Sequence, residues 1–265
     1  AGRSAATDET LPAELHLAWS RQLPSPLPAW PEDPRLGFDR VPEPVVAGHT
    51  LFVASNRNDS LIAVDTRTGN VTWRFFAEAP IRFAPLIAGD KVVFAADDGC
   101  LYAVSAASGK LAWKFNAAPT VRKVIGNDRL ISVWPIRGGP VLDGDRVRFT
   151  VGIWPFEGNF LYAVDVGTGQ LAADKGPDVA VRTHKDLTPQ GYLAVTGRRL
   201  YIPCGRAIAA GLDLSTGKSL SYSYSTSRVT SYHVSAIGPW LFHGAVSFDT
   251  ANNRQLPISG RQPVL

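Results

Sequence analysis

The sequence lacks the features that mark several large classes of protein. Among its 265 residues there are two cysteines, Cys100 and Cys204. They form neither a CxxC pair nor a zinc-ligand spacing, and nothing in their positions implies a disulfide. The histidines show no metal-ligand spacing, and there is no Gly-rich phosphate loop or Gly-x-Ser-x-Gly nucleophile turn. The sequence therefore offers no catalytic residue and no metal ligand.

Long apolar runs and long basic runs are missing as well. No apolar stretch approaches the roughly 18 residues that a membrane span needs. Lys plus Arg number 27 against 23 Asp plus Glu, so the net charge of +4 is small and is spread along the chain. We expect no membrane span and no nucleic-acid partner, because domains that bind nucleic acid usually concentrate Lys and Arg on one face.

The first ten residues, AGRSAATDET, are small and polar. Such a segment is typical of the mature N-terminus that remains after a secretory signal is cleaved. We predict that residues 1–14 are disordered or a leader remnant, and that residues 15–265 form one array. The protein is then expected to be periplasmic or extracellular.

What the sequence does contain is an internal repeat of one strand, one turn and a second strand. Its first strand alternates large apolar with small or polar residues, as a half-buried strand does. A short hairpin turn with the pattern Asp-x-x-Thr-Gly comes next. The copies are LIAVDTRTGNVTWRF (61–75), LYAVSAASGKLAWKF (101–115), LYAVDVGTGQLAADK (161–175) and, more weakly, AGLDLSTGKSLSYSY (210–224).

The aspartate and the glycine of each repeat turn are expected to have structural roles. An aspartate accepts backbone N–H groups at the start of the turn, and a glycine tolerates positive φ at its end. The residues concerned are Asp65, Gly69, Gly109, Asp165 and Gly169.

Two further strands precede each copy, and they complete a four-stranded unit. Their signal is Pro-x-x-x-Gly-Asp and then an alternating apolar run, as in PVVAGHTLFVAS (44–55) and PLIAGDKVVFAA (85–96). Four-stranded units at this spacing are typical of β-propeller blades. We predict an all-β propeller of four-stranded antiparallel blades at about 44–76, 84–116, 139–174, 192–224 and 232–257. The segment 15–23 is expected to be the last strand of a further blade, and the Pro-rich segment 25–44 a loop.

The repeat resembles the signature of pyrroloquinoline quinone (PQQ) enzyme repeats, Ala-x-Asp-x-x-Thr-Gly-x-x-x-Trp. It runs from Ala63 to Trp73, and again from Ala103 to Trp113 with Ser105 in the Asp position. The resemblance covers residues 44–224 and implies that Trp73 and Trp113 are structural, largely buried and wedged between blades. Rings of this family usually have seven or eight blades, so the chain is expected to be part of such a ring or an unusually small one.

Two copies depart from this signature. The third has Ala173 in the tryptophan position, and the fourth has Ser221 beside Tyr222. We expect these two blade junctions to be packed differently.

The resemblance leaves two functions open. One is a non-catalytic binding or scaffold propeller without a cofactor, as in the propeller lipoprotein of outer-membrane assembly. The alternative is a PQQ-dependent quinoprotein dehydrogenase that oxidises alcohols or sugars with the quinone and calcium, or a fragment of one. Many such enzymes carry an adjacent Cys-Cys pair, which this sequence lacks. The scaffold is therefore the preferred hypothesis.

One long connection, residues 117–139, breaks the repeat and suggests a binding site. Long loops in compact domains are often functional, and this one is basic and contains Trp134. We predict that it meets the Trp-Pro-Phe-Glu loop at 154–157 on one face and binds a protein or an anionic small or polymeric ligand. The alternative is a loop that covers a blade edge, with its Trp buried and its arginines in solvent. The proposed ligand-binding residues are Arg122, Arg129, Trp134, Arg137, Trp154 and Glu157.

Overall fold

The computed structural model describes residue 10 and residues 13–172, 181–182, 188–204, 207–220, 232–244, 246–252 and 254–256. Its regular structure is β-strand except for one 3₁₀ turn, η1 (Pro34–Leu36). The predicted all-β class is therefore confirmed. Almost all of the predicted leader segment 1–14, together with Ala173, Ser221 and Tyr222, lies outside the described residues.

Four of the sheets are simple antiparallel meanders of four strands. The first contains β1 (Val45–Ala47), β2 (Thr50–Ser55), β3 (Ser60–Asp65) and β4 (Val71–Phe76). The second contains β5 (Leu86–Ala88), β6 (Lys91–Ala95), β7 (Cys100–Ser105) and β8 (Leu111–Asn116). The fourth blade contains β16 (Ala194–Thr196), β17 (Arg199–Cys204), β18 (Ala207–Asp213) and β19 (Ser219–Leu220). The fifth contains β20 (Val234–Ile237), β21 (Trp240–His243), β22 (Val246–Asp249) and β23 (Arg254–Gln255).

The third blade is larger than the repeat predicts. Its antiparallel strands are β11 (Ile136–Asp143), β12 (Arg146–Val151), β13 (Phe160–Asp165) and β14 (Val181–Arg182). A fifth strand, β15 (Gly191–Tyr192), runs parallel to β11. The added strand covers the inner edge of the sheet, where the other blades end at their first strand.

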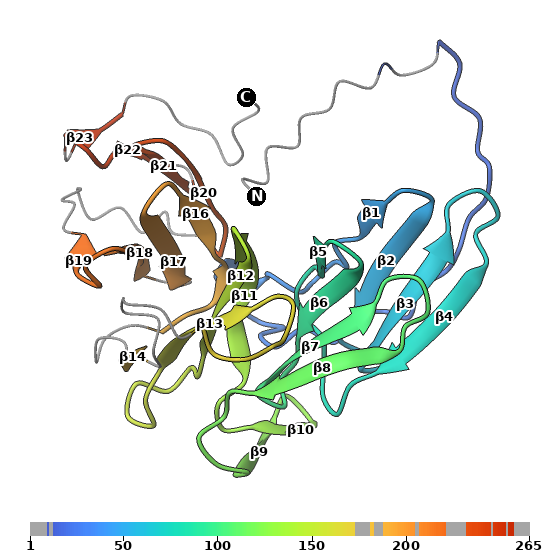
Figure 1. The fold of residues 1–265 in the computed structure, drawn as a ribbon, viewed down its shortest axis with the longest axis horizontal. Coiled ribbons are helices and arrows are strands. Elements are labelled where there is room, and N and C mark those ends of the chain that lie inside the picture. Colours follow the sequence, from blue (N-terminus) through green and yellow to red (C-terminus); the bar gives the residue numbers. More distant parts are fainter. Residues whose placement is uncertain are drawn as a thin grey trace.

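The blades are arranged as an open ring (Figure 1). Neighbouring blades touch through their first strands, since β1 contacts β5, β5 contacts β11, β11 contacts β16 and β16 contacts β20. Apolar clusters fill each space between adjacent sheets, for example Phe52, Leu61 and Phe94 between the first two. Figure 1 shows the arc open between the β1–β4 sheet and the β20–β23 sheet, as expected for part of a larger propeller.

The connection at 117–139 is not the open loop that the sequence suggests. It contains a hairpin of β9 (Lys123–Gly126) and β10 (Arg129–Ser132), and its last residues already belong to β11. The turn is Asn127-Asp128, with φ of 47° and 60°. Two-residue turns with positive φ fit the twist of a hairpin, and Asn and Asp tolerate that conformation.

The first two blade junctions are each closed by a tryptophan that packs on a glycine of the next blade. Nε1 of Trp73 donates to the carbonyl oxygen of Ala106 at 3.0 Å, and its indole covers Gly109. A Cβ built on Gly109 would lie 2.6 Å from two ring atoms, and φ there is +68°. Trp113 repeats this on Gly169, with Nε1 donating to the carbonyl of Val166 at 2.9 Å.

These two tryptophans differ in one respect from the expectation that they are largely buried. Trp73 and Trp113 are half-buried. Asp65 and Asp165 accept backbone N–H groups within the repeat turns, at 2.9 Å from Thr68 and 2.7 Å from Thr168. The backbone N–H of Thr68 holds the pKa of Asp65 below its usual value, and the hydroxyl and backbone N–H of Thr168 do the same for Asp165.

A third docking tryptophan, Trp19, was not predicted. Its Nε1 donates to the carbonyl of Thr66 at 2.7 Å, and its ring covers Gly69. Arg21 donates to the carbonyl of Gly69 at 2.7 and 3.0 Å. Residues 15–23 form no strand in the described structure, yet Trp19 takes the place that Trp73 takes one blade later.

Candidate binding face

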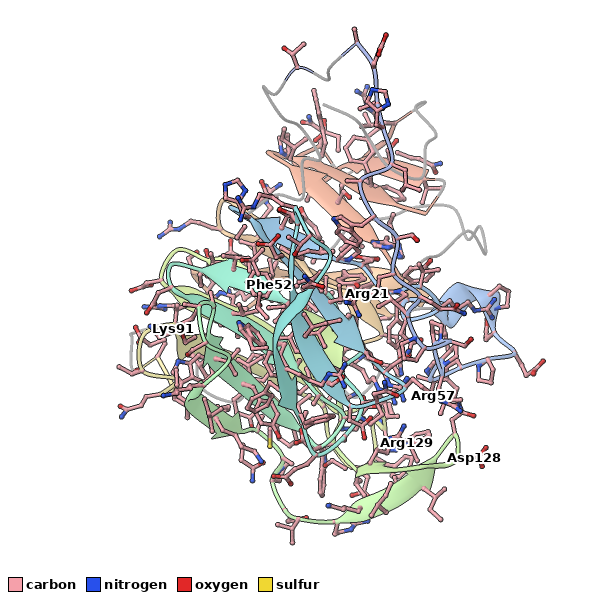
Figure 2. All side chains as sticks on the ribbon, turned by 90° about the vertical axis from the view of Figure 1, so that its right-hand side faces the viewer. Arg21, Phe52, Arg57, Lys91, Asp128 and Arg129 are labelled. Carbon is pink, nitrogen blue, oxygen red and sulfur yellow. The ribbon has the colours of Figure 1, made fainter. Side chains whose placement is uncertain are left out.

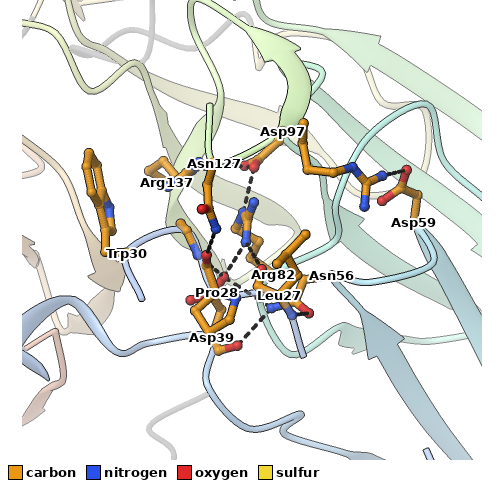
Figure 3. A network of polar contacts seen from close by, with 12 residues as sticks. Leu27, Pro28, Trp30, Asp39, Asn56, Asp59, Arg82, Asp97, Asn127 and Arg137 are labelled. Carbon is orange, nitrogen blue, oxygen red and sulfur yellow. Dashed lines mark hydrogen bonds and ion pairs between the residues drawn. The ribbon is translucent and has the colours of Figure 1, made fainter. Parts of the chain in front are cut away.

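The Pro-rich segment 27–39, which we call the strap, contributes Asp39 to a buried network of two arginines and two aspartates (Figure 3). Arg82 donates from Nε to Oδ2 of Asp97 at 2.5 Å and from Nη1 to Oδ2 of Asp39. Arg137 donates to both oxygens of Asp97, at 2.9 and 3.0 Å. All four side chains are buried. Arg137 is thus held in this network, apart from the binding residues with which the sequence grouped it.

The electrostatics of this network follow from burial and pairing. Burial opposes the charged form of Arg82, but Asp97 and Asp39 outweigh it and hold the pKa of Arg82 above its usual value. Burial outweighs the effect of Asp97 on Arg137, so the pKa of that guanidinium is lowered. Two positive and two negative charges balance, and removing one from such a group leaves an uncompensated buried charge.

Hydrogen bonds tie the strap to this network and to neighbouring loops. The backbone N–H of Leu27 donates to Oδ1 of Asn56 at 3.0 Å, and its carbonyl accepts from Arg82 at 3.0 Å. Nδ2 of Asn56 donates to the carbonyl of Asp39 at 2.8 Å, and Asn127 of the β9–β10 hairpin donates to the carbonyl of Pro28. Blade 1, blade 2 and the hairpin therefore all hold the strap.

Apolar contacts fix the other end of the strap over the centre of the ring. Phe38 stacks on Phe83 with ring centroids 5.0 Å apart and planes 5° apart. Tyr192 meets Phe83 edge to face at 5.0 Å. These rings belong to one buried cluster together with Ala29 and Ala84. The Pro-rich loop therefore packs as part of the core.

Arg129 is also paired, at a different place from Arg122. It donates to the carbonyl of Arg57 at 3.0 Å and to Oδ2 of Asp59. Figure 2 shows Arg129 beside Arg57, with Asp128 at the tip of the hairpin. Burial raises the pKa of Asp59, although Arg129 acts in the opposite direction. The contact bends the hairpin back onto the β2–β3 loop of blade 1.

Three of the six predicted binding residues do come together. Arg122 donates to both carboxylate oxygens of Glu157, at 3.0 and 2.9 Å, and its guanidinium lies 5.5 Å from the ring centre of Trp134. Nε1 of Trp134 donates to the carbonyl of Glu157 at 3.1 Å. Trp134 is buried and Arg122 is exposed. The contacts join the base of the hairpin to the loop between β12 and β13.

Trp154 lies on this loop beside a pocket of about 620 Å³. Its ring stacks on Phe156 with centroids 6.1 Å apart. The opposite wall belongs to the strap and includes Trp30, whose Nε1 donates to Oε1 of Gln190 at 3.2 Å. A cavity of this size with mostly apolar walls and few polar groups has the properties of a ligand site.

Neither Trp30 nor Gln190 was predicted from the sequence, because the residues that each contacts are remote along the chain. Trp30 and Gln190 are 160 residues apart, and neither belongs to the repeat. Trp30 stands in a Pro-rich stretch, and an aromatic residue in such a loop is a weak signal.

No three His, Cys, Asp or Glu side chains of the described residues lie together in a way that would hold a metal ion. In the same part of the chain, no helix is long and apolar enough to span a bilayer.

Several solved structures share this fold. BamB from Moraxella catarrhalis is 20% identical, with a TM-score of 0.53 over 79% of this chain. Quinohemoprotein alcohol dehydrogenase from Comamonas testosteroni is 19% identical, with a TM-score of 0.51 over 69%. The quinohemoprotein alcohol dehydrogenase ADHIIG from Pseudomonas putida HK5 is 16% identical, with a TM-score of 0.57 over 83%. This chain spans 57%, 35% and 42% of their respective lengths. At these identities, the likeness shows the fold.

The sequence matches no curated protein. It does match a family model, described as outer membrane protein assembly factor BamB, over residues 16–176. That range begins just before Trp19 and ends after the third repeat turn, so it contains all three tryptophan–glycine junctions. The match covers more than half of the sequence, and the chain therefore belongs to this family of PQQ-repeat propellers.

Proposed function

We propose that this chain is a non-catalytic scaffold propeller that binds a protein partner. The binding surface would be the β9–β10 hairpin together with the loop 152–159, which we call the hairpin face. The family description supports a role in outer-membrane protein assembly, and thus a periplasmic location.

The main support for this proposal is that exposed apolar side chains are concentrated on the hairpin face. Ile125 and Leu130 are a cross-strand pair on the hairpin, 76% and 59% exposed. Phe156 on the neighbouring loop is 78% exposed. Among the described strands, the hairpin is a sheet of two, so each of its strands has one partner there. Exposed apolar patches and unpaired strand edges are typical of surfaces that dock another protein.

The pairing of the arginines that the sequence grouped as ligand-binding favours a protein over a free anion. Arg122, Arg129 and Arg137 are each paired with a carboxylate of the chain itself. An anionic ligand would have to displace Glu157, Asp59 or Asp97. A partner that docks on the apolar residues leaves these ion pairs in place.

The residues present do not fit the quinone and calcium of the related dehydrogenases. Calcium takes six to eight oxygen ligands. Asp97 and Asp39 are committed to Arg82 and Arg137 in the buried network. No acidic cluster elsewhere in the described ranges replaces them. We propose that the protein works without a cofactor.

A titration tests this proposal against the dehydrogenase alternative. Adding PQQ and calcium to the purified protein is expected to leave the absorbance spectrum equal to the sum of its components. A quinoprotein dehydrogenase serves as the positive control under the same conditions. A saturable spectral change at one quinone per chain, lost when calcium is chelated, would favour the alternative.

A further inference from the structure

The pocket between the strap and the third and fourth blades has a composition that selects one kind of ligand. Trp30 and Leu36 line it from the strap, and Ile153 and Trp154 line it from the β12–β13 loop. The charged residues of its described lining are Glu32 and Asp33, both acidic. Two indole rings next to carboxylates favour an organic cation, because the face of an indole attracts positive charge.

Gln190 adds a hydrogen-bond donor of fixed orientation. Its side chain is 3% exposed and lines the pocket. An indole N–H only donates, so the carboxamide atom that faces Trp30 must be the oxygen, and the amide nitrogen points away from Trp30. That nitrogen has no hydrogen-bond partner among the described residues. It is therefore available to donate to a carbonyl oxygen of a ligand.

We propose that this pocket binds an arginine of an extended segment of a partner protein. Each part of an arginine residue matches a part of the lining. Its planar cation can stack on an indole ring, and its aliphatic stem can pack against Leu36 and Ile153. Its backbone carbonyl can accept a hydrogen bond from Gln190. Its positive charge complements the exposed carboxylate of Glu32. The inference rests on the proposed function as a protein-binding scaffold, and names a second contact, made in the pocket and not by the exposed side chains of Ile125, Leu130 and Phe156.

The thiol of Cys204, which also lines the pocket, fits a non-covalent site. Burial raises the pKa of Cys204 to about 11. The thiolate form, which is the nucleophile, is therefore scarce at neutral pH. Sγ instead lies 3.5 Å from the carbonyl oxygen of Ile202. Binding at this site is expected to be reversible.

The test uses the capped peptide acetyl-Gly-Arg-Gly-amide and its citrulline analogue, which keeps the shape of arginine but has no charge. Binding to the full chain is followed by calorimetry. We expect saturable binding of the arginine peptide and a loss of about 10-fold or more with citrulline, as a desolvated cation–π contact of about 2 kcal/mol implies. Citrulline binding as tightly as arginine, or titration without saturation, would overturn the proposal.

Variants of the protein locate the site. Trp154→Ala is expected to weaken binding of the arginine peptide by about 10-fold or more. Glu32→Gln, at an exposed position, is expected to weaken it by about 2- to 5-fold and to reduce its salt dependence. Trp240→Ala, at a 47% exposed tryptophan of the fifth blade, is the matched control and should change nothing. Unchanged binding in both pocket variants would contradict this assignment.

Further variants distinguish a failure of the pocket proposal from a failure of the proposed function. Asp substitutions at Ile125 and Leu130 on the hairpin face should abolish partner binding without affecting the arginine peptide. If partner binding persists in that variant while the peptide still binds the pocket, the hairpin proposal fails and the pocket remains. If the peptide fails while the hairpin face still binds a partner, the pocket alone is refuted.

Discussion

Replacing Arg82 with methionine is expected to lower the free energy of unfolding by about 3–5 kcal/mol. The substitution leaves Asp39 with no cationic partner and leaves Asp97 with Arg137 alone. It also removes the hydrogen bond that holds the carbonyl of Leu27. The expected loss is large because both aspartates are buried and cannot be stabilised by water. Denaturant unfolding followed by circular dichroism measures it.

A comparison with an exposed arginine shows how much of the expected loss of stability is due to the burial of Arg82. Arg122→Met removes a bidentate pair with Glu157, but Arg122 is exposed, so we expect a much smaller loss of stability than for Arg82→Met. Adding Asp39→Asn to Arg82→Met should recover part of the stability, because it removes the uncompensated charge. Equal losses for Arg82→Met and Arg122→Met would contradict the role given to the buried network.

The junction between the first two blades gives the second large effect. Trp73→Ala is expected to lower the free energy of unfolding by about 3 kcal/mol, the lower end for a large aromatic because the ring is half-buried. Gly109→Ala should cost about 2–3 kcal/mol, because its Cβ would lie 2.6 Å from the Trp73 ring. In the Trp73→Ala background the clash is absent, and only the strain of positive φ remains, about 1 kcal/mol.

The double-mutant cycle isolates this contact. We expect the two substitutions to be non-additive by about 1–2 kcal/mol, because the Trp73 ring that a Cβ at position 109 would clash with is absent from the double variant. Trp240→Ala, at an exposed tryptophan that takes no part in this contact, serves as the control and should cost less than about 1 kcal/mol. If the effects of the two substitutions on the free energy of unfolding add within about 0.5 kcal/mol, the Trp73 ring does not restrict position 109 to glycine.

The features that could be predicted from the sequence are those that depend on residues within a single repeat. Asp65, Gly69 and Trp73 lie within nine positions of one another, and their roles in a turn and the strand after it depend on local geometry. The same pattern recurs forty residues later around Gly109 and Trp113. Local hydrogen bonds and side-chain alternation therefore specify the all-β blades, and stacking results because one blade cannot bury both faces.

The hairpin at 123–132 carried a signal that was overlooked. Asn127-Asp128 stands between two short alternating runs, KVIG and RLIS, which is the pattern of a hairpin with a two-residue turn. The length of the connection and its arginines favoured a loop instead. The free hairpin is a weak element by itself, and its contacts with Pro28, Arg57 and Asp59 stabilise it in place.

The strap and the pocket could not be predicted, because their contacts join residues far apart in sequence. Asp39 pairs with Arg82 across 43 positions. Asn127 reaches Pro28 across 99, and no periodicity links them. Whether an arginine binds a ligand or a buried aspartate depends on which loops meet, and the repeat does not specify that. This is why Arg137 and Arg129 were grouped with Arg122.

Site-specific photo-crosslinking tests the central claim, that the hairpin face docks a protein partner. A photoreactive phenylalanine at Leu130, or at Phe156, is introduced into the full-length protein in its own host, with Trp240 as the exposed control position. We predict one shared adduct from Leu130 and Phe156, identified by mass spectrometry as a component of outer-membrane protein assembly, and none from Trp240. Adducts of equal yield from all three positions, or no adduct from Leu130 and Phe156, would contradict the claim.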